Sequence, residues 1–160
     1  MNYNQTGVRR QDRLLSESDA VSLLREGEYG CLSLVDEAGN PYGIPISYVW
    51  DGNESIYLHC APEGKKLKCI AKQPNVSFSV VGRTNVIPEK FTTVYSSIVI
   101  EAEAMLVAED EERMYALKLL VSKYSPGLEE TGLKYAKGSF QRTAVVKLKI
   151  LNWSGKAKVM

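Results

Sequence analysis

Histidine is nearly absent from this chain, which has 160 residues and a single histidine, His59. A serine hydrolase needs a histidine base beside its nucleophile, often with the serine in a G-x-S-x-G turn, and no such turn occurs. The glycine-rich loops G-x-x-x-x-G-K-S/T and G-x-G-x-x-G are also missing. The sequence therefore argues against a catalytic triad and against the usual phosphate-binding loops.

Cysteine is scarce too, and the three cysteines, Cys31, Cys60 and Cys69, form no C-x-x-C pair. With only one histidine available, a conventional zinc site would need unusual ligands, so no metal site is expected. Cysteines without an evident disulfide pattern are simplest to explain in a reducing compartment. We therefore expect a cytoplasmic protein.

The chain has no excess of charge and no long hydrophobic run. Its 20 basic and 19 acidic residues give a formal net charge of +1, which offers no bulk attraction to nucleic acid or to a membrane surface. The polar start before Arg9 and Arg10 contains no apolar run that would serve as a signal peptide or a membrane span. Neither nucleic acid nor a membrane is an expected partner.

Alternating hydrophobicity predicts a fold rich in strands. The predicted strands are residues 29–35, 42–50, 56–60, 76–81, 95–107 and 144–151. Turn residues at 36–40 and 51–54 predict that the first three strands form an antiparallel meander, with strand 42–50 beside strand 56–60. Because strands and helices do not alternate as βαβ units, a mainly β (α+β) fold with a closed or partly closed antiparallel barrel is favoured.

Helices are expected at the periphery of this barrel. Ser16 or Ser18 is placed to cap a helix that ends at Gly27, and a second helix should run from Gly64 to Pro74. Further helices are predicted at 110–124 and, less regularly, at 128–140, whereas residues 82–93 are expected to be a long surface excursion. We expect a single domain, residues 16–156, after an N-terminal extension, 1–15, and before a C-terminal tail, 157–160.

Two acidic residues of the predicted strand 95–107 deserve a check for glycosidase chemistry. Glu101 and Glu103 alternate with an apolar row, which is the pattern of the exposed face of a strand. A solvated strand face is therefore the better interpretation.

The most informative segment is 56–67, which is typical of a strand, a sharp turn and a helix that opens with Lys65 and Lys66. Cations are unfavourable at a helix N-terminus, because its free N–H groups already carry partial positive charge. The lysine pair therefore suggests a bound anion, most simply a phosphate, with His59 on the same rim. Solvated surface lysines and a structural histidine are the plainer alternatives.

Three segments, residues 28–35, 39–48 and 58–67, resemble the pyridoxamine 5′-phosphate oxidase-like flavin-binding split barrels. The similarity is greatest to the nitroimidazole-resistance (Nim) branch, through the histidine, alanine, glycine and lysine spacing of 59–66 and the later segment 88–93. It extends over residues 9 to 156. The resemblance implies a six-stranded antiparallel split β-barrel and a homodimer with two flavin mononucleotide (FMN) sites at the subunit interface.

The resemblance also implies roles for individual residues. Lys65 and Lys66 would hold the phosphate, and Trp153 would be either a wall of the ring site or a packing anchor. Residues expected to line the flavin within one subunit are Ile44, Pro45, Ile46, Ser47, His59, Cys60 and Ala61. Residues expected to reach it from the other subunit are Tyr95, Ser96 and Ser97.

The implied activity is that of a flavin-dependent oxidoreductase, a nitroreductase or flavin reductase acting on a small aromatic substrate. FMN is the expected cofactor and FAD the alternative, and His59 would donate a proton to the substrate or position it. Residues 153–160 lack the arginine and histidine with which true oxidases grip pyridoxamine phosphate, so vitamin B6 oxidation is not expected. A non-catalytic flavin carrier or sensor, and a heme-binding split barrel with His59 as ligand, are the other functions considered.

Overall fold

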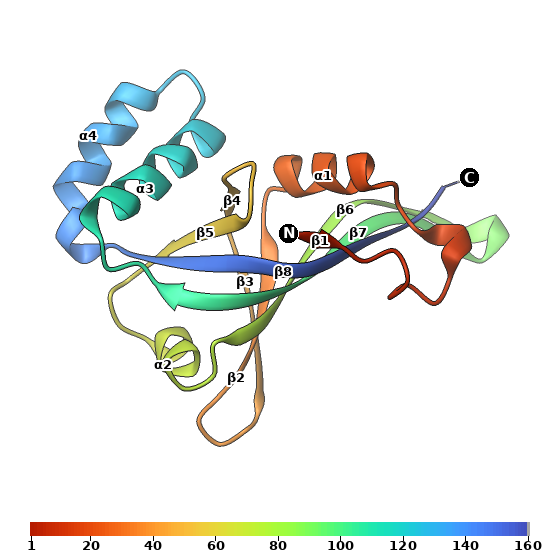
Figure 1. Cartoon of the computed structure of the whole chain (residues 1–160). Coiled ribbons are helices and arrows are strands. Elements are labelled where there is room, and N and C mark those ends of the chain that lie inside the picture. Colours follow the sequence, from red (N-terminus) through yellow and green to blue (C-terminus); the bar gives the residue numbers. More distant parts are fainter. Residues whose placement is uncertain (160) are drawn as a thin grey trace.

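The computed structural model describes residues 1–159 and is built mainly of strands (Figure 1). The strands are β1 (Asn2–Tyr3), β2 (Gly30–Val35), β3 (Pro41–Ile46), β4 (Val49–Trp50), β5 (Ser55–Cys60), β6 (Asn75–Ile87), β7 (Thr92–Leu106) and β8 (Ala144–Lys158). The helices are α1 (Glu17–Glu26), α2 (Lys65–Lys72), α3 (Asp110–Tyr124) and α4 (Glu129–Ser139), with short 3-10 turns η1 (Gln11–Arg13), η2 (Pro88–Lys90) and η3 (Phe140–Arg142). The predicted C-terminal tail ends at Met160, which lies outside the described residues.

All strands join one sheet in the order β3-β2-β6-β7-β8-β5-β4, with β1 added in parallel to β8. The other pairs are antiparallel. The two edge strands, β3 and β4, are consecutive in the chain and are separated only by Ser47 and Tyr48. The sheet therefore curls so that its edges meet through the chain without pairing, and the predicted antiparallel split barrel with peripheral helices is confirmed, with eight strands instead of six.

The predicted meander of the first three strands is right at its two turns but wrong for the body of the second strand. Strand β2 pairs with β3, but β5 pairs with β8 and β4 instead of lying against β3. The predicted strand 42–50 breaks at Tyr48, whose side chain is fully buried and donates a hydrogen bond to the Leu24 carbonyl at 2.6 Å. This inward anchor turns the chain from one edge of the sheet to the other, which sequence alternation alone does not reveal.

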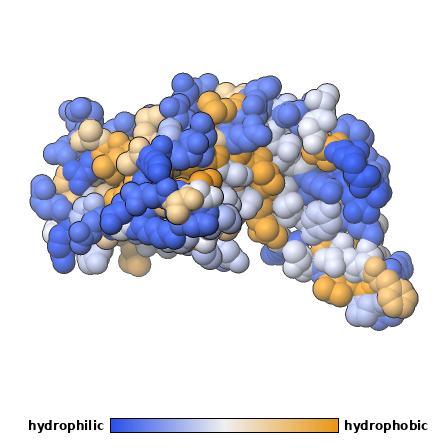
Figure 2. Space-filling view, turned by 90° about the horizontal axis from the view of Figure 1, so that it is seen from below, coloured by the Kyte–Doolittle hydropathy of each residue, from blue (hydrophilic) through white to orange (hydrophobic). Residues whose placement is uncertain are grey.

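The segment 82–93 lies at the surface as expected, but it is a regular hairpin, because β6 continues to Ile87 and β7 begins at Thr92. A register shift between Val81 and Thr84 interrupts the alternation of apolar and polar residues. Both faces of the hairpin beyond it are largely exposed, so its sequence shows no apolar face. The hairpin forms an arm that projects from the barrel (Figure 1). Its tip exposes Phe91 at 97% and Val86 at 65%, and Figure 2 shows apolar side chains on the projecting end.

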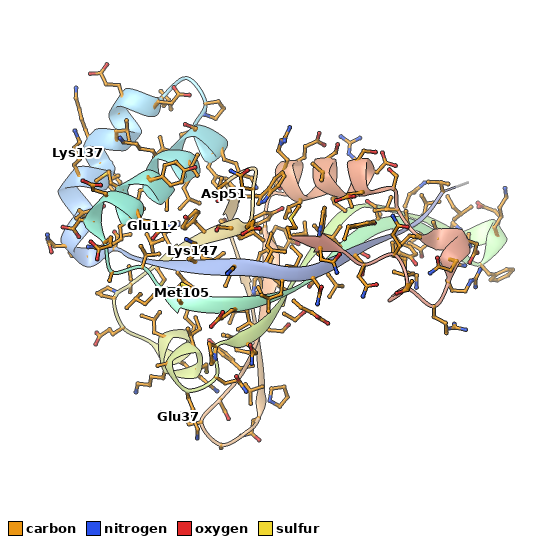
Figure 3. All side chains as sticks on the ribbon, in the orientation of Figure 1. Glu37, Asp51, Met105, Glu112, Lys137 and Lys147 are labelled. Carbon is orange, nitrogen blue, oxygen red and sulfur yellow. The ribbon has the colours of Figure 1, made fainter. Side chains whose placement is uncertain are left out.

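Two hydrophobic cores share the sheet. The larger lies inside the barrel, where Phe78, Ile100 and Trp153 are buried beneath α1 and α2. The smaller lies on the outer face, where Tyr57 and Val145 pack under α3 and α4. Tyr57 and Lys147 both donate hydrogen bonds of 2.7 Å to Oε1 of Glu112 of α3, so polar contacts also hold this helix to the sheet (Figure 3).

Candidate functional site

Helix α2 begins without any of the usual stabilisers of a helix N-terminus. Its N-cap residue is Gly64, which has no side chain to cap the helix. The φ angle of Gly64 is 143°, a positive value that glycine adopts more readily than other residues. The first turn holds no acidic residue, whereas α1, α3 and α4 all begin with acidic side chains. Exposed N–H groups and lysines at one point are a suitable cradle for an anionic group such as a phosphate. The chain's own residues therefore fit the phosphate expected from the sequence.

The two lysines of this turn diverge. Lys65 is 54% exposed and lies 3.2 Å from a carboxylate oxygen of Asp36, with its ammonium 4.5 Å from the centre of the Tyr42 ring. The pKa of Asp36 is lowered, first by a backbone hydrogen bond from Asn40 and further by Lys65. Lys66 is half-buried on the other side, where its charge adds to the effect of burial that lowers the pKa of His59 and opposes the larger effect of burial that raises the pKa of Cys60. The side chain of Lys65 thus contacts the β2–β3 turn, whereas that of Lys66 lies near the end of β5.

A cleft of about 840 Å³ opens over the start of α2. It is bordered by Asp36, Glu37, Ala38, Ala61, Glu63, Gly64, Lys65, Lys68 and Cys69. Charged side chains of both signs face this space, which is the setting expected for a polar or ionic group. Figure 3 places Glu37 at the outer end of the β2–β3 turn, beside α2.

His59 lies near the end of β5, on the outer face that carries α3 and α4. It is opposite Val145 of β8 and borders a groove beneath the two helices. The His59 side chain is exposed at the surface, but desolvation by its neighbours, and then the positive charge of Lys66, lower its pKa below the ordinary value of 6.5. The imidazole is therefore neutral at pH 7 and offers one N–H donor and one lone pair. His59 stands between the charged cleft and this groove.

The groove beneath α3 and α4 has a volume of about 660 Å³ and a mostly apolar lining. The lining residues are Ser47, His59, Leu117, Leu120, Val121, Tyr124, Ser125, Leu128, Thr131, Gly132, Tyr135, Ala136, Ser139 and Thr143. Of the residues predicted to form the site, only Ser47 and His59 belong to this set. The contributions of α3 and α4 were missed, because their apolar stripes looked like ordinary core-facing residues.

The predicted flavin-lining run of β3 lies at one edge of the sheet. Ile44 and Ile46 turn inward against the barrel core, whereas Pro45 and Ser47 are exposed. Since β3 and β5 do not pair, the sheet itself does not join this run to His59. The two meet instead at Ser47, which shares the groove with His59.

Tyr124 of α3, which was not predicted, secures this meeting point. Its hydroxyl accepts a hydrogen bond from the Tyr48 amide at 2.9 Å and lies 2.8 Å from the Tyr48 carbonyl and 2.6 Å from that of Glu28. The phenol therefore holds the turn from β3 to β4 against both α3 and the start of β2. No sequence signal distinguishes this tyrosine from a packing residue.

Tyr95, Ser96 and Ser97 lie far from His59 along the sheet of one chain. Ser97 pairs with Lys156 of β8 and His59 pairs with Val145, so the two are about 35 Å apart along that strand. Tyr95 has cationic neighbours, and a hydrogen bond with Arg13 lowers its pKa, with Lys156 adding to the effect. Within one chain, residues 95–97 therefore do not share a site with His59.

Trp153 and Cys60 take positions with little access to a ligand. Trp153 is 2% exposed and packs edge-on against Tyr3 at 4.9 Å between ring centres, which is the position of a packing anchor. Cys60 is half-buried against the barrel core, and burial raises the pKa of its thiol. Ala61, by contrast, borders the charged cleft.

The structure also bears on metals and membranes. Within residues 1–159, no three histidine, cysteine or acidic side chains gather as metal ligands. No described helix is long and apolar enough to cross a bilayer.

Solved structures with this fold come from several bacteria. A candidate 5-nitroimidazole antibiotic resistance protein of Bacteroides thetaiotaomicron is 18% identical, with a TM-score of 0.74 over 91% of this chain and 86% of its own. A conserved hypothetical protein of Mycobacterium tuberculosis is 17% identical, with a TM-score of 0.80 over 94% and 89%. An FAD-binding protein of Mesorhizobium loti is 19% identical, with a TM-score of 0.66 over 92% and 98%. At these identities the similarity establishes the fold.

The family follows from the sequence itself. No curated protein sequence matches significantly. A family model described as pyridoxamine 5′-phosphate oxidase matches residues 16–157, which is nearly the whole chain and includes both cavities at the end of β5. The resemblance inferred from three short segments is thereby confirmed. The chain belongs to the pyridoxamine 5′-phosphate oxidase family.

Proposed function

We propose that this protein binds a flavin at the end of β5 and is a flavin-dependent oxidoreductase that acts on a small aromatic substrate. The observation that carries the proposal is the start of α2, where free N–H groups, Gly64 and two lysines form an anion cradle in a member of this family. The N–H groups and the lysines favour an anion, and a flavin phosphate would supply one.

Structural neighbours support a flavin over other phosphate ligands. They include the FAD-binding protein of Mesorhizobium loti, an FAD and heme binding protein of Mycobacterium smegmatis and a flavocytochrome of Azotobacter vinelandii. The Bacteroides thetaiotaomicron neighbour supports a nitroaromatic compound as substrate, which is the finer part of the proposal. FMN is proposed as the cofactor, with FAD as the alternative.

Each part of the site has a proposed task. Lys66 and the first N–H groups of α2 hold the phosphate, and Lys65 joins them when it leaves Asp36. The free edge of β3 offers backbone groups to the polar rim of the ring at 44–47. A bound flavin would supply electron transfer, which the chain's side chains do not. His59, neutral at pH 7, orients the substrate through its N–H donor or its lone pair.

We also propose a homodimer, in which Tyr95, Ser96 and Ser97 of one chain complete the site of the other. The separation of these residues from His59 within one chain is the reason. Sedimentation at working concentration should give the mass of two chains, and a monomer would refute this part.

An absorption spectrum of the purified protein tests the central claim. The flavin bands in the near ultraviolet and blue should be present or should appear, shifted and with quenched fluorescence, after flavin is added. A Soret band instead would favour the heme alternative. Protein that neither contains flavin nor takes it up would refute the proposal.

The role of His59 needs a separate test. We expect His59→Ala to bind flavin normally but to reduce a nitroaromatic compound more slowly than the unchanged protein, with a nicotinamide donor present. Full activity of the variant would remove His59 from the mechanism. A flavin-loaded protein without turnover for any donor and acceptor would point to the carrier or sensor function.

A further inference from the structure

The groove beneath α3 and α4 is a second binding space that the phosphate cradle does not use. None of the described residues around it is aspartate, glutamate, lysine or arginine, and His59 is its only titrating side chain besides two tyrosines. Its volume of about 660 Å³ falls within the range of small-molecule pockets, roughly 300–1,000 Å³. The cleft at α2 is of similar size but is charged.

Helices α3 and α4 contact each other closely beside the groove, and its mouth is open to solvent. A Cβ atom on Gly132 of α4 would lie 2.5 Å from Cγ1 of Val121, so glycine lets the helices approach closely at that point. At the mouth, Leu128 and Tyr135 are exposed at 62% and 77%, and they present apolar surface to solvent without a cover from the described chain. A flat apolar molecule would remove this surface from water.

The floor of the groove carries the few polar groups that would orient such a molecule. Ser47 is exposed at the end of β3, His59 is neutral at pH 7, and Thr143 borders the same space from the start of β8. Ser47 and His59 are the two residues that the groove shares with the proposed flavin site. A molecule in the groove would therefore abut that site.

We propose that this groove binds uncharged aromatic molecules of one to three rings, and that they are the substrates of the flavin site. The second part rests on the proposed function. The absence of charged side chains from the lining selects against carboxylated or phosphorylated compounds, because an ion there would lose water without gaining a partner. The cleft over α2, in contrast, offers an anion two possible partners, Lys65 and Lys68.

A pair of fluorescent probes tests the binding site directly. N-phenyl-1-naphthylamine is uncharged, and 1-anilinonaphthalene-8-sulfonate is the same molecule with a sulfonate. The full chain should bind the uncharged probe at one saturable site per chain and at least tenfold more tightly than the sulfonate. Because the chain has one histidine, its imidazole NMR signals should also shift when the uncharged probe binds.

Substitutions at the groove locate the probe. Thr131→Trp fills the groove from an exposed position on α4, and Ser139→Trp does so from the other end of that helix; each should weaken binding at least tenfold. The matched control is Lys137→Trp, at an exposed position of α4 that does not line the groove and that Figure 3 places on the outer side of the helix. Equal binding by all three variants, tighter binding of the sulfonate, or unmoved histidine signals would overturn the proposal.

A flavin titration of the same samples separates this proposal from the one on which it rests. Flavin uptake with no probe binding overturns the groove and leaves the flavin site standing. Probe binding without flavin uptake supports the groove and overturns its role as a substrate site. If Thr131→Trp instead converts a dimer to monomers, the groove is an interface between chains and the proposal is wrong.

Discussion

Two cavities flank the end of β5, and they contrast in charge. The cleft over α2 is bordered by Asp36, Glu37, Glu63, Lys65 and Lys68, whereas the groove beneath α3 and α4 has no such side chain in its described lining. His59 borders the groove, yet its pKa responds to Lys66 at the start of α2. One short strand thus separates a place for an ionic group from a place for an apolar one, which is the division that a phosphorylated aromatic cofactor and its substrate require.

The largest effect is expected at the charged side. Replacing Lys65 and Lys66 with alanine removes two charge-assisted contacts of about 1.5–3 kcal/mol each, so flavin affinity should fall roughly 10²- to 10⁴-fold. Fluorescence quenching of added flavin measures the affinity. A double variant of Lys134 and Lys137 on α4 makes the same change in net charge and should bind normally. Equal flavin affinities in the two double variants would show that Lys65 and Lys66 are ordinary surface lysines that do not bind the phosphate.

The apolar side is expected to be most sensitive at Gly132. A methyl group there meets Val121 at 2.5 Å, so Gly132→Ala should separate α3 from α4 and lower the free energy of unfolding by about 1–3 kcal/mol. Gly138 of the same helix has no atom within 4 Å of an added Cβ, and Gly138→Ala should stabilise by roughly 0.5–1 kcal/mol. Urea denaturation of both variants gives the comparison. The same sign for both would mean that the helix contact is not tight.

A smaller effect is expected where the two sides are joined. Tyr124→Phe removes the hydroxyl that accepts from the Tyr48 amide and lies against two carbonyls, which should cost roughly 1–2 kcal/mol of unfolding free energy. Tyr135→Phe, at a tyrosine exposed at 77%, is the control and should be neutral. An equal loss of unfolding free energy in Tyr135→Phe would show that the effect of Tyr124→Phe does not depend on these hydrogen bonds.

The smallest effect is expected in the pKa of His59, which responds to the charge of Lys66 at the start of α2. Lys66→Ala should raise the pKa of His59, because a nearby positive charge disfavours the imidazolium. Lys65→Ala should change it less, since Lys65 is paired with Asp36. NMR titration of the single histidine measures both. An unchanged pKa of His59 in Lys66→Ala would show that the charge at the start of α2 has no effect on the groove.

The same pKa has a consequence for stability. The folded chain keeps His59 neutral to a lower pH than the unfolded chain, whose histidine titrates near the ordinary value of 6.5. Protonation therefore favours the unfolded state, and the contribution of His59 to the free energy of unfolding should decline as the pH falls below that value. His59→Gln should lessen this decline in pH-dependent denaturation.

The fold was largely predictable because its regular parts have strong local signals. Alternation marked the strands of the barrel, Ser16 caps α1 as expected, and Gly64 begins α2 as expected. The arm was missed because alternation has meaning only where one face is buried, and both faces of residues 82–87 are largely exposed. The pairing of β5 with β8 was missed because register between distant strands depends on the buried Tyr48 and on the turn it makes.

The candidate site divides in the same way. The start of α2 was predictable, since helix termini have a known electrostatic preference that Lys65 and Lys66 violate. The groove was not, because Leu117 and Leu120 follow the same helical period whether they face a core or border a cavity. The distance between Ser97 and His59 likewise follows from the length of β8, which extends to Lys158 instead of ending at 151.

The pairing of Lys65 with Asp36 implies that a carboxylate of the chain competes with the proposed phosphate for Lys65. A phosphate that recruited Lys65 would take it from a carboxylate of the same chain, so that exchange would be between two anions and not between an anion and water. Affinity would then reflect the difference between the two partners, and Asp36→Asn would free the ammonium and strengthen binding of the phosphate. An internal counter-ion of this kind offsets the charge of Lys65, so an anion would gain less by binding there than it would from an unpaired ammonium.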